Sequence, residues 1–247
     1  MSKKKFQEIN FFYMLCFMIS GLLFALANFI CQSLQLAYLQ KLLLVPMIVQ
    51  FSPTIAYLVT CKRYPVDGRI DLQINFHPSL FLALLVPLIQ IGAVRYFRSS
   101  FSYPPIASLD VPFLLFVFVT SFLGSLGEEI GWRGYLYHSL GDEMDKYKSA
   151  GLSGLLWGLW HVTKIFSVGF GAYLIFVLTC IPMSMILNYM NDQAKGSLLP
   201  SILCHTFINC GVMFFLFNQE NLVVHLISLA CYTCICLLLY LKNKLTT

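Results

Sequence analysis

Long blocks of apolar residues recur along the whole chain, and they constrain its fold more than any other feature. A helix of about 20 mostly apolar residues is needed to cross the hydrocarbon core of a bilayer. Eight blocks approach this length: 11–30, 42–59, 80–94, 111–126, 150–166, 170–187, 198–217 and 222–241. Because they are apolar throughout, without the alternation of barrel strands, they indicate helices. We therefore predict an all-α polytopic membrane protein with about eight transmembrane helices.

The amino-acid composition is also that of a membrane protein. Charged residues make up 11% of the chain and hydrophobic residues 58%, whereas soluble domains carry about 25% charged residues. The net charge of +5 comes from basic residues scattered among the apolar blocks, which does not indicate a nucleic-acid partner. Most of the nine cysteines lie in apolar runs, where a thiol packs as a small hydrophobe. The expected surroundings are lipid, without a disulfide framework.

The placement of lysine and arginine predicts the orientation, because cytoplasmic loops carry an excess of both. With the N-terminus inside, eleven of the 16 basic residues fall in inside loops. Four fall in outside loops, among them Lys164, and Arg133 is kept as a candidate site residue. Both termini are thus predicted to be cytoplasmic. The first apolar run follows a lysine cluster like a signal peptide, but it is longer than a usual signal core, which favours an uncleaved span.

Two adjacent acids follow the fourth apolar block, at a depth where ionisable groups are costly and mark functional candidates. On a continuing helix, Glu128 shares a face with small residues of the preceding turns, and such faces pack on other helices. Glu129 stands four residues before Arg133, the spacing of a helical ion pair. We predict different tasks for the two carboxylates: Glu129 pairs with Arg133, and Glu128 serves as a general base. The alternative is an ordinary pair of acids at the membrane boundary.

Two later blocks carry histidines on polar faces. His161 falls on the same helical face as the glycines of its block, and Ser201, His205 and Asn209 form a stripe at successive turns. A lone histidine on a packed face is more often structural, and histidine or asparagine side chains also hold membrane helices together. Taken together with the acids, these groups could converge in one intramembrane catalytic cavity open to the cytoplasm. Such a set can activate water and stabilise an oxyanion.

These residues resemble the motifs of the CPBP intramembrane proteases, also called the Abi family, which includes CAAX proteases and bacteriocin-processing enzymes. The family is similar to the type II CAAX prenyl endopeptidases. The three motifs stand in order as Glu128-Glu129-x-x-x-Arg133, Trp157-x-x-x-His161 and His205-x-x-x-Asn209. Trp157 replaces the usual phenylalanine, and we interpret it as an aromatic replacement that leaves the chemistry intact.

The resemblance divides the chain into three parts. Residues 111–217 form the predicted protease core. Residues 1–110 are predicted to form about three N-terminal spans, and residues 218–247 a C-terminal transmembrane helix, without motifs of their own.

The resemblance also implies roles for the site residues. Glu128 is the base that activates water, and Glu129 with Arg133 is its supporting pair. The residues that line the attack site and help to hold the oxyanion are His161, His205 and Asn209.

The cofactor is left open at this stage. Members of the family have been called metalloproteases, yet the sequence contains no H-E-x-x-H motif. A catalytic zinc needs three protein ligands, and the candidates are His161, His205 and Glu128. A metal-free water activated by Glu128 uses the same residues. We favour the metal-free version because Asn209, one turn from His205, suits an oxyanion better than zinc.

The expected function is that of an intramembrane endopeptidase acting on a membrane-associated peptide or protein near the cytoplasmic face. By resemblance we expect it in the cytoplasmic membrane of a bacterium. The alternative is a non-enzymatic protein of the same fold, a bacteriocin self-immunity factor or a membrane scaffold. A transporter is disfavoured because the sequence shows no internal repeat. The substrate's identity and the oligomeric state stay open.

Overall fold

The computed structural model describes residues 1–64, 77–97, 110–215 and 221–246 of the chain. Helices account for nearly all of these residues, and no β-strand occurs among them. The predicted all-α class is therefore confirmed.

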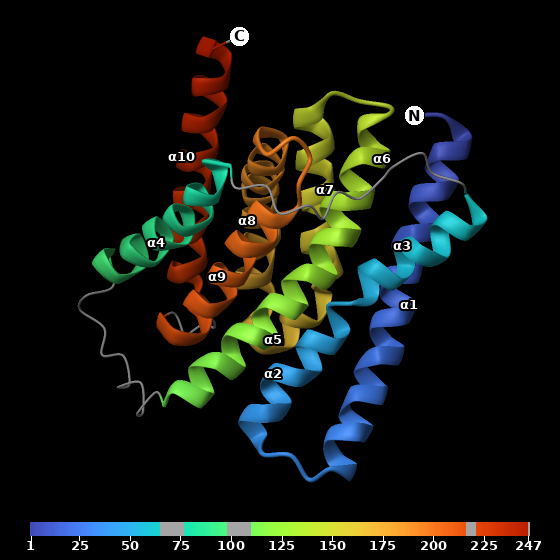
Figure 1. The fold of residues 1–247 in the computed structure, drawn as a ribbon, viewed down its shortest axis with the longest axis vertical. Helices are drawn as coiled ribbons and strands as arrows, with labels where there is room; N and C mark the ends of the chain where they lie inside the picture. The colour runs from blue at the N-terminus through green and yellow to red at the C-terminus, as the bar shows by residue number, and fades with distance from the viewer. Residues whose placement is uncertain (65–76, 98–109, 216–220, 247) are drawn as a thin grey trace.

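The first helices of the chain gather on one side of the molecule (Figure 1). α2 (Tyr38–Val49) and α3 (Ser52–Arg63) both pack along α1 (Lys3–Ser33). α4 (Ser79–Phe97) lies on the other side, where it packs against α9 and α10.

The second half of the chain forms the centre of the bundle. α5 (Val111–Glu129) continues into the π-helix η1 (Ile130–Tyr137) and the short α6 (His138–Gly141). α5 packs on α2 and α9, while α8 packs on both α7 and α10. The remaining elements are α7 (Lys146–Trp160), η2 (Val162–Lys164), α8 (Ile165–Gln193), α9 (Leu199–Phe215) and α10 (Leu222–Thr246).

Within the described parts of the chain, six helical stretches are long and apolar enough to cross a membrane. They are Lys3–Ser33, Tyr38–Arg63, Ser79–Phe97, Val111–Gly141, Val162–Gln193 and Leu222–Lys244. The other two predicted blocks correspond to shorter helices, α7 with 15 residues and α9 with 17. The polytopic prediction is therefore confirmed. The end of the block predicted at 198–217 lies outside the described residues, and the catalytic cavity stays a prediction.

The block predicted as one helix at 42–59 contains a break. α2 ends at Val49 and α3 begins at Ser52, with Pro53 in its first turn. Proline has no N–H to donate and its ring fixes φ, so it favours the start of a helix and disfavours its interior. The break places Gln50 and Phe51 beside α5, where an added Cβ on Gly127 would lie 2.7 Å from the Gln50 carbonyl oxygen.

The block predicted at 150–166 ends earlier than expected. α7 stops at Trp160, His161 follows as its C-cap, and the 3₁₀ turn η2 leads into α8. α8 is itself kinked at Gly169, whose φ of 79° is open to glycine but not to most residues. Lys164 lies in η2, where its side chain is partly buried and its Nζ lies 4.7 Å from the centre of the Phe176 ring. Its predicted position on the outside stays a prediction.

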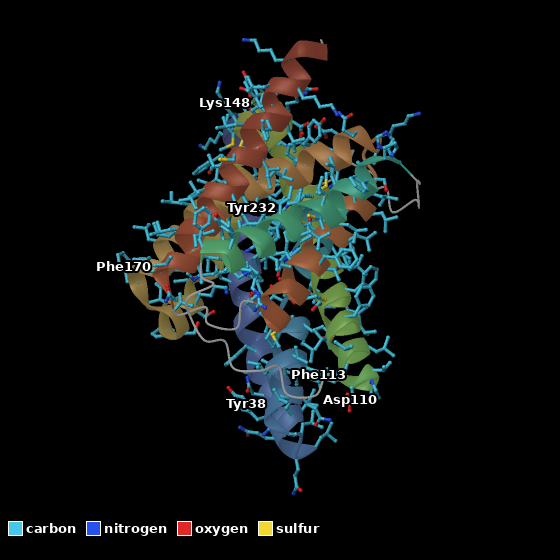
Figure 2. The ribbon with its side chains drawn as sticks, turned by 90° about the vertical axis from the view of Figure 1, so that its left-hand side faces the viewer. Tyr38, Asp110, Phe113, Lys148, Phe170 and Tyr232 are labelled. Atoms are coloured by element: carbon cyan, nitrogen blue, oxygen red, sulfur yellow. The ribbon has the colours of Figure 1, made fainter. Side chains whose placement is uncertain are left out.

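Both termini lie beside the turn that joins α6 to α7. The backbone N–H of Ser2 donates to Glu143 over 2.9 Å, and the side-chain amide of Asn243 donates to the Tyr147 hydroxyl over 3.0 Å. Figure 2 shows Lys148, in the first turn of α7, at the end of the molecule opposite Tyr38. The termini and this turn therefore face the same side of the membrane, whichever compartment that is.

We predict that this shared side is the cytoplasm, because it carries the larger number of lysines. Epitope tags at each terminus and between α6 and α7 are expected to bind antibody only after the membrane is permeabilised. The matched control is a tag in the α1–α2 connection, which is expected to bind antibody in intact cells. Exposure of the α6–α7 tag before permeabilisation would reverse the orientation.

Candidate active site

Glu128 and Glu129 lie at the end of α5, and neither side chain is exposed. Their neighbours on the preceding turn, Gly124 and Ser125, are also buried, so this face of α5 packs against other helices. The chain then continues as the π-helix η1. π-helical turns are rare and frequently occur at functional sites. The two acids thus stand at an irregular point in the interior of the bundle.

Glu129 is the centre of a buried ionic cluster. Its Oε1 lies 3.0 Å from Nη1 of Arg133 and 2.9 Å from Nδ1 of His205. The guanidinium of Arg133 also lies over the indole of Trp157, with Cζ 4.1 Å from the ring centre. A buried charge requires such partners, because desolvation without them is prohibitive. The cluster joins η1, α7 and α9 around one carboxylate.

Glu128 has a different set of partners. Its Oε1 accepts a hydrogen bond of 2.6 Å from the side-chain amide of Gln50, and its Oε2 accepts one of 2.5 Å from the indole N–H of Trp157. Both donors are neutral, so they orient the carboxylate without neutralising its charge. Adjacent glutamates are thus distinguished by their neighbours, one paired with a cation and one held by neutral donors.

The two histidines lie on either side of Trp157. The centre of the indole is 5.8 Å from that of His161 and 5.3 Å from that of His205, both edge-on. Nδ1 of His161 lies 2.9 Å from the backbone oxygen of Trp157, which can only accept, so this nitrogen carries the proton. In a neutral ring Nε2 is then an acceptor.

Asn209 is less closely joined to this group. Its side-chain amide donates to the hydroxyl of Ser125 over a long distance of 3.4 Å. This hydrogen bond links α9 to α5 one turn before the two glutamates. The structure therefore brings Glu128, Glu129 and Arg133 together with both histidines, and it places Asn209 at their edge.

Two contributions were missed by the sequence analysis. The first is the hydrogen bond that Gln50, in the break between α2 and α3, donates to Glu128. Its only sign in the sequence was a single side-chain amide within an apolar block. The second is the hydrogen bond of Trp157, whose indole N–H donates to Glu128, whereas a phenylalanine ring has no donor to offer. Whether the replacement leaves the chemistry intact stays a prediction.

The arrangement of donors also bears on the question of zinc. Among the described residues, no three histidine, cysteine, aspartate or glutamate side chains gather closely enough to hold a metal ion. Nδ1 of each histidine is engaged with an oxygen, which leaves Nε2 of each ring to face a ligand. Since the described side chains do not gather around one point as a zinc site requires, we derive no step through a metal.

Comparison with known proteins finds a family that the segment containing this site resembles. Residues 110–211 match the family of Rce1-like type II CAAX prenyl endopeptidases. This segment includes both glutamates, Arg133, both histidines and Asn209. The predicted resemblance to type II CAAX prenyl endopeptidases is therefore confirmed.

One relative resembles a larger part of the chain. It is the CAAX prenyl protease 2 of Methanococcus maripaludis, which is 28% identical over 159 residues. The alignment covers 59% of this chain and 55% of the relative. The chain thus spans about half the length of the curated relative that it matches.

We predict that the ionic cluster is a stability element. Glu129→Gln leaves the Arg133 cation buried without its carboxylate, which costs about 3–5 kcal/mol. A clear fall in the melting temperature of the purified chain in detergent is expected.

The matched control is Asp145→Asn, which removes an exposed ion pair with Lys148 but keeps a good N-cap residue for α7. It is expected to leave the melting temperature almost unchanged. Equal melting temperatures for the two variants would contradict the assignment.

Proposed function

We propose that this chain is an intramembrane endopeptidase, which hydrolyses a peptide bond of a membrane-associated peptide or protein near the cytoplasmic face. The observation that carries the proposal is the buried Glu128 carboxylate, which is oriented by two neutral donors. One of these donors, Trp157, also contacts both histidines. The similarity of residues 110–211 to type II CAAX prenyl endopeptidases supports it.

The proposed reaction begins with a water molecule beside Glu128. The carboxylate takes one proton from the water as its oxygen forms a bond to the carbonyl carbon of the substrate. Nε2 of His161, an acceptor in the neutral ring, orients the water through its other hydrogen. The proton taken by Glu128 passes to the departing amine as the C–N bond breaks, which restores the carboxylate.

The carbonyl oxygen becomes negatively charged in the tetrahedral intermediate, so it needs donors. His205 can supply one from Nε2 when it is an imidazolium, while its Nδ1–H donates to Glu129. Asn209 supplies a second donor if its amide turns from Ser125 toward the substrate. Arg133 holds Glu129 in place and takes no part in the bond changes.

The proposed substrate class follows from the comparisons. The matched family and the archaeal relative are both described as acting on CAAX prenyl proteins. We therefore propose a peptide or protein whose C-terminal region carries a prenylated cysteine, presented from the cytoplasmic leaflet. The lipid group would keep the scissile bond at the membrane surface, within reach of a buried site.

Replacement of the base provides the test of this function. Glu128→Gln keeps the size of the side chain but removes its ability to accept a proton, and general-base catalysis contributes about 10²–10⁴-fold. The full chain in liposomes is expected to cleave a fluorogenic peptide ending in a prenylated CAAX sequence, and the variant to lose at least a hundredfold in kcat.

The melting temperature of each protein serves as the folding control in this experiment. Near-normal cleavage by a folded Glu128→Gln variant would remove Glu128 from the role of base. A folded wild-type chain that fails to cleave the peptide would favour the non-enzymatic alternative.

A second prediction concerns metal ions. Because the proposed reaction uses a water activated by Glu128 and no metal step, turnover of the same peptide is expected to persist after exhaustive chelation. The metal content of the active preparation, measured by mass spectrometry, is expected to be far below one zinc per chain. Stoichiometric zinc that disappears together with activity in His205→Ala would show the opposite.

A further inference from the structure

Gln50 lies in the break between α2 and α3, and its amide reaches across to the end of α5. The Nε2 atom of Gln50 is 2.6 Å from Oε1 of Glu128. This contact joins positions 78 residues apart in the chain, across the boundary of the segment that matches the protease family. The N-terminal helices thus contribute directly to the site.

The surface of α5 is shaped to receive this residue. An added Cβ on Gly124 would overlap the Gln50 carboxamide, and one on Gly127 would lie 2.7 Å from the Gln50 backbone oxygen. The hydroxyl of Thr54, in the first turn of α3, donates to the carbonyl of Gly127 and fastens the helix break to α5. Two glycines and this hydrogen bond therefore hold the amide against Glu128.

We propose that Gln50 is a positioning residue for the reaction: with Trp157 it fixes the rotation of the Glu128 carboxylate that activates water. The inference rests on the proposed function and names the part played by the N-terminal helices. A carboxylate held at only one oxygen can turn about its side-chain bonds. A carboxylate held at both oxygens by neutral donors keeps its charge and a fixed orientation. Each oxygen still retains a lone pair that can accept a hydrogen bond from the water.

The geometry predicts a kinetic signature for the loss of this donor. Gln50→Met keeps the length of the side chain and removes the amide. Because a displacement of about 1 Å at a reacting group can cost a hundredfold in rate, we expect kcat for the prenylated CAAX peptide to fall about tenfold to a hundredfold. KM is expected to stay unchanged, since Gln50 contacts the base rather than the substrate.

A second glutamine provides the matched control. Gln90 in α4 donates to the hydroxyl of Ser228 in α10 over 3.0 Å and is more deeply buried than Gln50. Gln90→Met therefore removes the same kind of side-chain hydrogen bond between two helices that hold none of the candidate site residues, and kcat is expected to stay at the wild-type value. If the loss of an amide acted only through stability, both Gln50→Met and Gln90→Met would have lower melting temperatures. Their kcat and KM values would then be alike, which would contradict a positioning role for Gln50.

Gly124→Ala tests the same contact from the other side. Its methyl group displaces the Gln50 amide while leaving Gln50 in the chain, so kcat is expected to fall as in Gln50→Met. The double variant is expected to be no slower than the slower single variant, because both changes break one contact. Additive losses would contradict a shared cause.

An activity-independent measurement separates this inference from the proposed function. The infrared difference spectrum between the chain and its Glu128→Gln variant isolates the carboxylate band of Glu128. In Gln50→Met the antisymmetric stretch is expected to shift, and in Gln90→Met it is expected to stay in place. An unshifted band, or a wild-type kcat in Gln50→Met, would overturn the inference even if the wild-type chain is an active protease. Failure of the wild-type chain to cleave, with a shifted band, would overturn the proposed function alone.

Discussion

The burial of two adjacent carboxylates in the middle of a helical membrane protein is the constraint on which the rest of the site depends. Neither Glu128 nor Glu129 is exposed, and a buried charge is tolerated only with partners close at hand. Glu129 meets this condition through Arg133 and His205. Glu128 meets it through two neutral N–H donors. Three helical elements, η1, α7 and α9, and a helix break therefore converge on the end of α5.

The division of partners explains how neighbouring residues of the same type can have separate tasks. One oxygen of Glu129 contacts both the Arg133 guanidinium and the His205 ring, so Glu129 is suited to hold these two side chains in place. A carboxylate held by amide and indole groups remains available to a water molecule. Trp157 connects the surroundings of Glu128 with the ionic cluster of Glu129, because its N–H donates to Glu128 and its ring face lies against the Arg133 guanidinium.

The helical class and the identity of the charged site residues were predictable, because apolar blocks and costly polar groups leave local signals in a sequence. The Glu129–Arg133 pair was predictable for the same reason, since its spacing lies within one helix. The part played by Gln50 was not predictable from the sequence. Its contact with Glu128 depends on how the break between α2 and α3 packs against the glycines of α5, far along the chain. The role of Trp157 was missed because sequence pattern alone does not tell which way an indole N–H points.

The most direct measurement of the central claim is a structure of the chain in a lipid bilayer with an uncleavable prenylated peptide analogue. If hydrolysis takes place at Glu128, a water molecule will bridge its carboxylate and Nε2 of His161, with the carbon that replaces the scissile carbonyl about 3–3.5 Å away. The polar side chains of α9 will face that position. An analogue bound on another face of the bundle, with Glu128 still enclosed by its two donors and closed to water, would contradict the account.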